Sequence, residues 1–384
     1  MTAVDLSPIR ADLARLGRPP SPLDVAEALR RRGHVVTDTT LFSTVEEIRR
    51  HSVGAGPLEE LLRAPGVTDV LVNGHDRVYV DRGAGLELTG VRFRDESDLR
   101  SFAQRLANGA GRRLDTAMPY ADARLADGTR VHAILGTLAS PGTCVSLRIP
   151  SRTRLTLDDW VETDSVSSAG AKLLEQLVRS RLAFLVTGGT GSGKTTLMAT
   201  LLGVVPEDQR LVIVEDSREL DPDHPHVVRL EGRPANAEGQ GAVSLTALVR
   251  QALRMRPDRL VVGEVRGAEL CDLLTAMNTG HEGGCGTVHA NSPADVPARL
   301  EALAALGGLG RLAVHAQVAA ALHAVVHLRR LPGGGRRITA VHVLTRSDDT
   351  GLVVTEAAVT FEPAGEIRRG PGCSRLERLL AAGA

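Results

Sequence analysis

At 384 residues the chain is longer than one hydrophobic core usually serves, so its length predicts two domains. Its 46 basic and 46 acidic residues cancel, and five Phe, two Tyr and one Trp leave little for base stacking, which argues against nucleic acid as a ligand. Four cysteines without a CxxC pair are typical of reduced thiols in a cytosolic protein, and no stretch is apolar enough for a signal peptide or for direct membrane insertion.

The pattern along the chain predicts four segments. Residues 1–60 form an extension with weakly helical stretches at 25–32 and 44–50, and residues 61–150 form an N-terminal α/β domain. A polar linker is expected over 151–165, followed by the main domain over 166–384. In the first domain we expect strands at 69–72, 78–80, 85–93, 121–125, 129–135 and 144–149, with a helix at 96–107.

In the main domain, helices and strands alternate. Helices are expected at 169–181, after the glycine-rich loop to 202, and at 245–255, 268–277, 294–306 and 376–382. Strands are expected at 183–187, 211–214, 260–262 and 286–289, followed by 324–328, 338–344 and 352–361. Strands joined by crossover helices require a parallel sheet covered on both faces, and the last three strands predict an antiparallel addition.

The strongest motif is GGTGSGKTT, which follows the apolar run 183–187. Of the 46 basic residues 44 are arginine, and Lys194, one of the two lysines, stands inside this motif. Its glycines let backbone N–H groups turn toward phosphates, the next helix presents its positive end, and the Thr195 hydroxyl can ligate magnesium. The expected nucleotide-binding residues are Gly188, Gly189, Thr190, Gly191, Ser192, Gly193, Lys194, Thr195 and Thr196.

Two acidic sites follow apolar strands. The strand at 211–214 runs into the carboxylates between Glu215 and Glu219, at the strand end where open α/β sheets bind ligands. One of them could orient the attacking water, although a turn or helix start also explains them. The strand at 260–262 ends in Gly263 and Glu264 and resembles a Walker B strand, with magnesium bound directly or through water.

A third cluster, TGHEGGCGTVHANS, spaces His281, Cys285 and His289 four residues apart. This spacing suggests zinc, but the glycines between them oppose a helix and a fourth ligand is not evident. We expect instead that both histidines lie beside the nucleotide and respond to its phosphate. Packed histidines are the alternative.

In this order the motifs resemble those of the hexameric traffic ATPases of bacterial type II and type IV secretion, type IV pili and conjugation, over about residues 65–330. The chain is most similar to the CpaF/TadA subgroup, associated with tight-adherence (Flp) pili and, in actinobacteria, labelled conjugal-transfer-associated. The runs that carry the resemblance are DVLVNGHDRVYVDRG (69–83), ADARLADGTRVHAIL (121–135), SLRIPS (146–151), LRMRPDRLVVGEVRG (253–267) and TGHEGGCGTVHANSPADVPARLEAL (279–303).

The resemblance implies a RecA-like P-loop NTPase core with a smaller N-terminal α/β domain, and ATP and Mg²⁺ as cofactors. Residues 188–196 match the Walker A loop, 211–219 the Asp box, 260–264 the Walker B strand and 279–289 the His box. The family's catalytic glutamate matches Glu219 and not Glu215. The other expected roles are phosphate binding by Lys194, metal support by Glu264, and contact with the γ-phosphate by Arg130 and Arg148, for which an ion pair is the alternative.

The resulting hypothesis is a homo-hexameric Mg-ATPase whose domains rotate about the linker during hydrolysis. Inner-membrane platform proteins would receive the motion to move pilin or a secreted substrate, and would hold the cytoplasmic enzyme at the inner face of the membrane. The alternatives are a nucleotide-gated adaptor without turnover, a DNA-moving conjugation motor and a small-molecule P-loop kinase. The neutral charge opposes the DNA motor, and the His box stands where a kinase would need an acceptor-binding lid.

Overall fold

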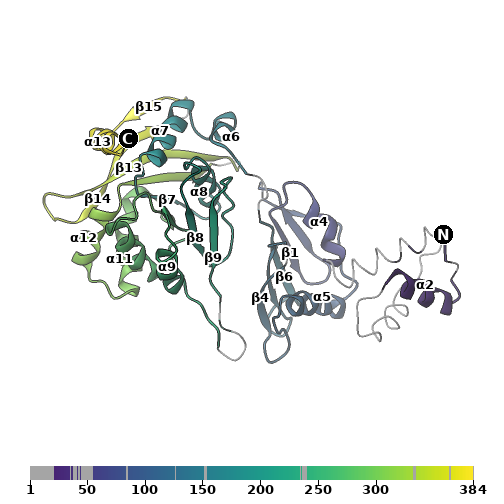
Figure 1. The fold of residues 1–384 in the computed structure, drawn as a ribbon. Helices are drawn as coiled ribbons and strands as arrows, with labels where there is room; N and C mark the ends of the chain where they lie inside the picture. Colours follow the sequence, from purple (N-terminus) through teal and green to yellow (C-terminus); the bar gives the residue numbers. More distant parts are fainter. Residues whose placement is uncertain are drawn as a thin grey trace. The chain divides into compact units, whose positions relative to one another are not determined.

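The fold was obtained as a computed structural model, which divides the chain into two compact units, Met1–Pro150 and Ser151–Ala384 (Figure 1). The residues that it describes are 21–34, 36–37, 41, 44, 55–83, 85–125, 127–150, 154–233, 235, 240–331, 334–362 and 365–383. The helix predicted at 25–32 is found as α2 (Pro22–Arg31), which begins with a capping box between Ser21 and Asp24. Of the one predicted at 44–50, residues 45–50 lie outside the described residues.

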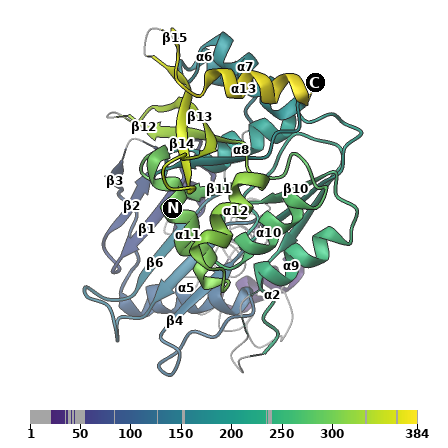
Figure 2. The same ribbon diagram turned by 90° about the vertical axis from the view of Figure 1, so that its left-hand side faces the viewer.

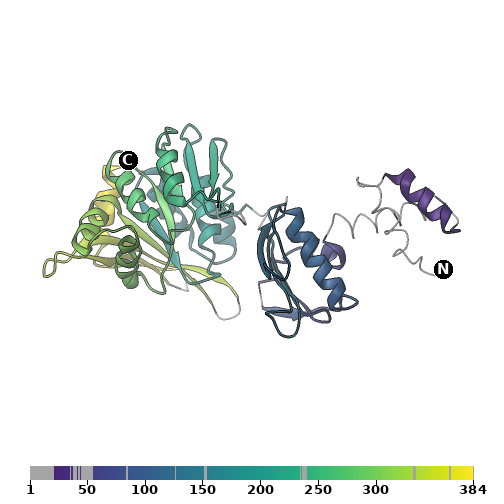
Figure 3. The same ribbon diagram turned by 90° about the horizontal axis from the view of Figure 1, so that it is seen from below.

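The first unit is built on an antiparallel sheet of six strands in the order β3-β2-β1-β6-β5-β4. The strands are β1 (Asp69–Asn73), β2 (Val78–Asp81), β3 (Leu86–Leu88), β4 (Tyr120–Arg124), β5 (Arg130–Ile134) and β6 (Cys144–Arg148). Its helical elements are α4 (Glu59–Arg63), α5 (Glu96–Gly109) and the short η1 (Gly56–Leu58). Helix α5 covers one face, where Phe102 and Leu99 join the core (Figure 3). The strand predicted at 85–93 is shorter, because β3 ends at Leu88.

The second unit contains a sheet of nine strands in the order β15-β14-β13-β12-β7-β11-β10-β8-β9. The strands are β7 (Phe184–Gly188), β8 (Leu211–Glu215), β9 (Val227–Glu231), β10 (Arg259–Val262), β11 (Cys285–His289), β12 (Ala324–Arg330), β13 (Arg336–Arg346), β14 (Val353–Phe361) and β15 (Ile367–Arg369). The pairs from β9 to β12 are parallel, and β13, β14 and β15 add antiparallel strands. The predicted arrangement is confirmed, with β9 and β15 in addition.

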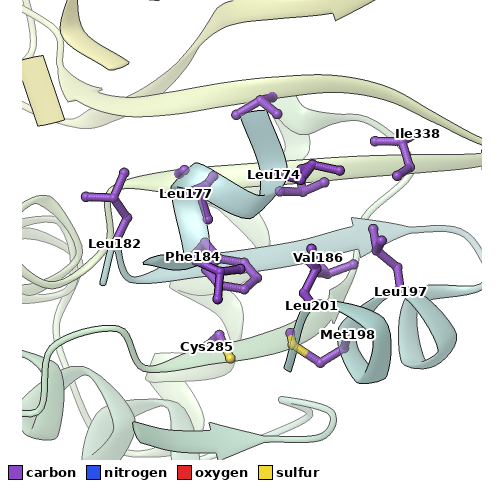
Figure 4. Packing of buried hydrophobic residues seen from close by; sticks show 14 of the residues in the cluster. Leu174, Leu177, Leu182, Phe184, Val186, Leu197, Met198, Leu201, Cys285 and Ile338 are labelled. Atoms are coloured by element: carbon purple, nitrogen blue, oxygen red, sulfur yellow. The ribbon is translucent and has the colours of Figure 1, made fainter. Parts of the chain in front are cut away.

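Helices cover both faces of this sheet (Figure 2). They are α6 (Leu157–Glu162), α7 (Ser168–Arg179), α8 (Lys194–Gly203), α9 (Leu245–Leu253), α10 (Glu269–Asn278), α11 (Val296–Leu306), α12 (Arg311–Ala321) and α13 (Cys373–Ala382), with the short η2 (Pro293–Asp295). Along β7, Phe184 and Val186 pack with α7 and α8, as Figure 4 shows, whereas Leu185 packs against α10 to α12. A strand buried on both faces explains the continuous apolar run in the sequence.

A helix stands where the sequence predicts a linker. Within 151–165, α6 begins at a capping box formed by Thr156 and Asp159. Its Trp160 is 3% exposed, and the indole N–H donates to the Thr200 hydroxyl of α8 at 3.0 Å. The single tryptophan of the chain therefore lies in the core of the second unit, which the polar composition around it did not indicate.

Helix α12 was not predicted, because His315 and Gln317 interrupt its apolar pattern. His315 is nevertheless buried, since its two ring nitrogens lie 2.6 Å from Glu301 Oε1 and 2.8 Å from the backbone nitrogen of Val353. Across the described ranges no single helix has the length and apolar character to cross a membrane. Only Pro293–Leu306 and α12 together would have them, and the chain bends by 118° between these two.

Candidate active site

The phosphate-binding loop connects β7 to α8 at the carboxyl edge of the parallel strands. Gly191 and Gly193 have φ angles of 70° and 98°, which side chains other than glycine rarely adopt. Gly193 is also the N-cap of α8, so no side chain accepts the first N–H groups of the helix. A methyl group at Gly188 would lie 2.5 Å from the carbonyl oxygen of Leu328. Each glycine thus serves a backbone shape suited to anions.

Lys194 lies against this loop with its side chain almost fully buried. Its Nζ donates to the carbonyl oxygens of Gly188 and Gly189 at 3.0 and 2.8 Å, and lies 3.2 Å from Nδ1 of His289. Burial lowers the pKa of the Lys194 ammonium, whereas the nearby Glu264 carboxylate acts to raise it. The ammonium is therefore held at the loop where phosphates would bind.

Lys194, His289 and Glu264 form a continuous polar relay. The other nitrogen of His289, Nε2, lies 3.0 Å from Oε1 of Glu264, and Oε2 of Glu264 accepts from Arg266 at 2.6 Å. Burial acts to raise the pKa of the Glu264 carboxyl, but the hydrogen bond and charge of Arg266, together with His289 and Lys194, lower it overall. The carboxylate is therefore ionised at neutral pH and available to a cation.

The relay exists because β7, β11 and β10 are parallel neighbours. Their register pairs His289 with Gly188, and β10 ends at Val262, two residues before Glu264. The Walker A loop, the last residue of β11 and the Walker B glutamate therefore meet at one edge of the sheet. Burial, followed by the charge of Lys194, lowers the pKa of His289, which keeps its imidazole neutral between the ammonium and the carboxylate.

Glu215 holds the Asp-box loop in place. It is the last residue of β8, and its Oε1 accepts the backbone N–H groups of Glu219 and Leu220, both at 2.9 Å. It is 4% exposed, and burial raises its pKa to about 7. The side chain of Glu219, expected to be catalytic, is exposed on the loop that Glu215 fixes.

Gly263 lets Glu215 occupy its buried position. A methyl group on Gly263 would lie 2.5 Å from Cγ and 3.0 Å from Oε1 of Glu215. The glycine before the Walker B glutamate is therefore required by the packing of the neighbouring strand end. The sequence alone does not explain this glycine, because the contact joins β8 to β10 through the register of the sheet.

The two histidines of the third cluster lie at opposite ends of β11. His289 ends the strand, whereas His281 precedes Cys285 at its beginning and donates its backbone N–H to Ala276 at the end of α10. A strand of five residues spans roughly 13 Å between its first and last residues. Within the chain, His289 contacts Lys194, whereas His281 lies beyond the opposite end of β11. The expected response of both histidines to phosphate stays a prediction.

The comparisons with known proteins identify the family. The profile of the type II/IV secretion system protein family matches residues 51–371. The chain belongs to this family. A Mycobacterium tuberculosis (strain H37Rv) protein provisionally named a conjugal transfer protein is 52% identical over 83% of this chain and 92% of its own. The type IV secretion system protein VirB11 of Brucella suis is 31% identical over 68% of this chain and 79% of its own.

A solved structure shares the fold. The pilus retraction motor PilT, solved with bound ADP, is 21% identical and matches 73% of this chain and 80% of its own, with a TM-score of 0.53. The family and the α/β fold class predicted from the motifs are confirmed, and the secretion ATPase family implies nucleotide binding.

In this member of the type II/IV secretion family, the two predicted arginine contacts lie in the first unit. Arg130 on β5 and Arg148 on β6 are directly opposite each other. The Nε of Arg148 donates to Asp69 at 3.1 Å, so the ion pair that was the alternative interpretation is present for this residue. The Arg148 side chain is 61% exposed, so it can still turn toward a ligand. Their contact with phosphate stays a prediction.

The first described residue of the second unit is bonded to the loop that follows the Asp box. Arg154 donates from Nε and Nη2 to Asp221 at 3.1 and 3.0 Å, and from Nη1 to Asp223 at 2.9 Å. Asp221 also pairs with Arg229 on β9, whose guanidinium donates to the carbonyl of Leu220. The chain that enters the second unit is thus attached to the loop that follows Glu219. No motif indicated this contact.

Proposed function

We propose that this type II/IV secretion family protein hydrolyses ATP to power pilus assembly or secretion through a Tad-like apparatus. The observation that carries the proposal is the relay from Lys194 through His289 to Glu264. It joins the Walker A loop, the His box and the Walker B strand next to one phosphate-binding loop.

The residues at this edge fit a nucleotide-bound magnesium ion. The Thr195 hydroxyl follows Lys194 at the start of α8, and Glu264 is ionised nearby. Both oxygens of Glu264 already contact His289 and Arg266, so we propose that the carboxylate supports the ion through water and that Thr195 binds it directly. When bound, magnesium would neutralise charge on the phosphates.

The protein's own residues would carry the reaction as follows. The Lys194 ammonium exchanges its carbonyl acceptors on Gly188 and Gly189 for the β- and γ-phosphate oxygens. Glu219 orients the attacking water and accepts its proton, while Glu215 fixes the backbone that carries Glu219. His289 reports the loss of the γ-phosphate to Glu264, because it contacts both the ammonium and the carboxylate.

The family resemblance supports a homo-hexamer working with membrane partners. In that assembly, Arg130 and Arg148 would reach the γ-phosphate when domains close, so turnover would depend on oligomerisation. Inner-membrane platform proteins would receive the motion and hold the cytoplasmic ring at the membrane. The VirB11 relative, named for a type IV secretion system, supports this partner class.

Mg-ATP turnover per subunit, measured over a range of protein concentrations, tests the proposal. We expect activity to rise steeply with concentration and to fall by roughly 10²–10⁴-fold in Glu219→Gln, with ATP binding retained. Glu207→Gln, an exposed glutamate after α8, is the matched control. Turnover per subunit that does not depend on protein concentration would refute a site that is completed by oligomerisation. Binding without turnover in wild type would instead support a nucleotide-gated adaptor, unless a platform partner restores activity.

A DNA-moving motor is the second candidate, favoured by the name of the mycobacterial relative. The balanced charge of the chain opposes it. A DNA motor should bind duplex or single-stranded DNA with an affinity that falls steeply as salt rises, because phosphate contacts release counterions. Absence of such binding by the nucleotide-bound protein would exclude this candidate.

A further inference from the structure

Two arginines outside the known motifs lie against the phosphate loop. Strand β12 is the second parallel neighbour of β7, and its register pairs Leu328 with Gly188. The strand continues two residues further to Arg330, and β13 returns from Arg336 directly opposite. The hairpin of β12 and β13 therefore carries a pair of guanidinium groups to the edge of the sheet where the loop begins.

The distances place both side chains at the loop. A methyl group on Gly193 would lie 2.9 Å from Cδ and 3.7 Å from Nη1 of Arg336, and one on Gly191 would lie 3.6 Å from Nη1 of Arg330. Arg336 thus packs on the N-cap of α8, next to the N–H groups that would bind phosphate. The arginine side chains can lie this close to the loop because the two glycines have no side chains.

This arrangement places two positively charged side chains directly opposite each other at the loop. Like charges directly opposite on antiparallel strands are destabilising. Burial and the neighbouring charge of Arg330 both lower the pKa of Arg336. In the part of the chain that the structure describes, no acidic side chain pairs with Arg336. With Lys194 and the positive end of α8 close by, an anion between these groups would relieve the repulsion.

The residues on the two sides of the loop indicate how a bound nucleotide would be oriented. Lys194, His289 and Glu264 mark the side of β11, where the γ-phosphate and its metal belong. The arginine pair marks the other side, beyond β12. A triphosphate extended across the loop, with its γ-phosphate on this first side, would place the α-phosphate and the base away from Glu264, toward Arg336.

We propose that Arg336, with Arg330 beside it, binds the α-phosphate of the nucleotide and so holds ATP and ADP alike. This inference rests on the proposed function, and it adds a binding group that none of the family's motifs contains. A guanidinium suits the role because it can form charge-assisted hydrogen bonds to phosphate oxygens and can lie flat on a purine ring. Contact with a phosphate that is not transferred predicts an effect on affinity and none on the chemical step.

The test is Arg336→Gln in the full chain, with ATP and ADP dissociation constants and steady-state kinetics. We expect both dissociation constants and KM to rise roughly tenfold while kcat stays within about twofold of wild type. Arg336→Lys should recover part of the affinity because it restores a charge. The matched control is Arg337→Gln: the next side chain on β13 points to the other face, where it lines a pocket with Ser165 and Phe361. Trp160 fluorescence reports whether each variant is folded.

The outcomes separate this inference from the function on which it rests. If wild type binds ATP and ADP but Arg336→Gln binds them equally well, the inference is wrong and the proposed ATPase stands. If kcat falls while both dissociation constants stay constant, Arg336 acts in the transition state and the α-phosphate assignment is also wrong. If wild type binds neither nucleotide, the proposed function fails before the inference is reached.

Discussion

Gly263→Ala tests whether packing between β8 and β10 holds the Asp box. The added methyl group would lie 2.5 Å from Cγ, 3.0 Å from Oε1 and 3.2 Å from Cδ of Glu215, which is 4% exposed and has no room to withdraw. Overpacking of a core costs about 1–3 kcal/mol. Displacing the carboxyl also weakens its two hydrogen bonds to the backbone of Glu219 and Leu220, at about 0.5–1.5 kcal/mol each. We expect a loss of about 2–6 kcal/mol in the free energy of unfolding.

The assay is urea unfolding followed by fluorescence of Trp160. This residue is the single tryptophan, and it lies in the core of the second unit, so its signal reports that unit although the whole chain need not unfold in two states. The matched control is Gly203→Ala at the end of α8, where the nearest atom to the methyl group is the carbonyl oxygen of Asp223 at an ordinary 3.6 Å. Its stability should be unchanged or slightly higher.

A double mutant identifies the cause. Glu215→Ala removes the atoms that the methyl group strikes, so Gly263→Ala should cost much less in that background than alone. The coupling between the two sites should exceed about 1 kcal/mol, whereas independent sites add to within about 0.5 kcal/mol. Additive losses, or a fully stable Gly263→Ala, would refute the packing argument.

Two further predictions concern the same loop. Burial raises the pKa of Glu215 from 4.5 to about 7, so the folded state keeps a proton that the unfolded chain releases, and the free energy of unfolding should fall by about 3 kcal/mol from pH 4.5 to 7 before it levels off. Glu215→Gln should remove this contribution in urea titrations at pH 5 to 8, and an unchanged slope would contradict it. Arg154→Gln should slow ATP turnover roughly two- to tenfold, since the loop that follows the Asp box loses the hydrogen bond between Asp221 and Arg154, while Arg179→Gln, at an exposed ion pair of α7, should not. Equal rates in the two variants, or equal loss of folding, would count against a role for Arg154 in positioning the loop.

The sequence predicted the elements whose signals are local. The phosphate loop needs only its glycines, Lys194 and an apolar strand before it, and these are contiguous. The end of β8 and the Walker B strand were predicted for the same reason. Strand β9 was missed because it is only half-buried and paired on one side with β8 alone.

The contacts that complete the site depend on register, which the sequence does not show. Whether His281 or His289 reaches Lys194 depends on where each lies relative to β11. His289 is the last residue of the strand and His281 precedes its first residue, which the equal spacing of four residues in the sequence does not reveal. Arg336 is far from the Walker A loop along the chain, so no local pattern could connect them. The burial of Glu215 could have been predicted from the sequence, because a carboxylate that is the last residue of a buried strand is itself prone to burial.

The strand order has a consequence for how the protein is made. The Walker A sequence is synthesised near the middle of the chain, but both neighbours of β7 in the sheet are synthesised much later. Strand β11 begins only at Cys285, and β12 only at Ala324. A nascent chain or fragment that stops before β11 would therefore contain every Walker A residue without a sheet to hold the loop in shape. Nucleotide binding should appear late in synthesis and abruptly, because long-range strand pairing and not the motif itself is the step that builds the pocket.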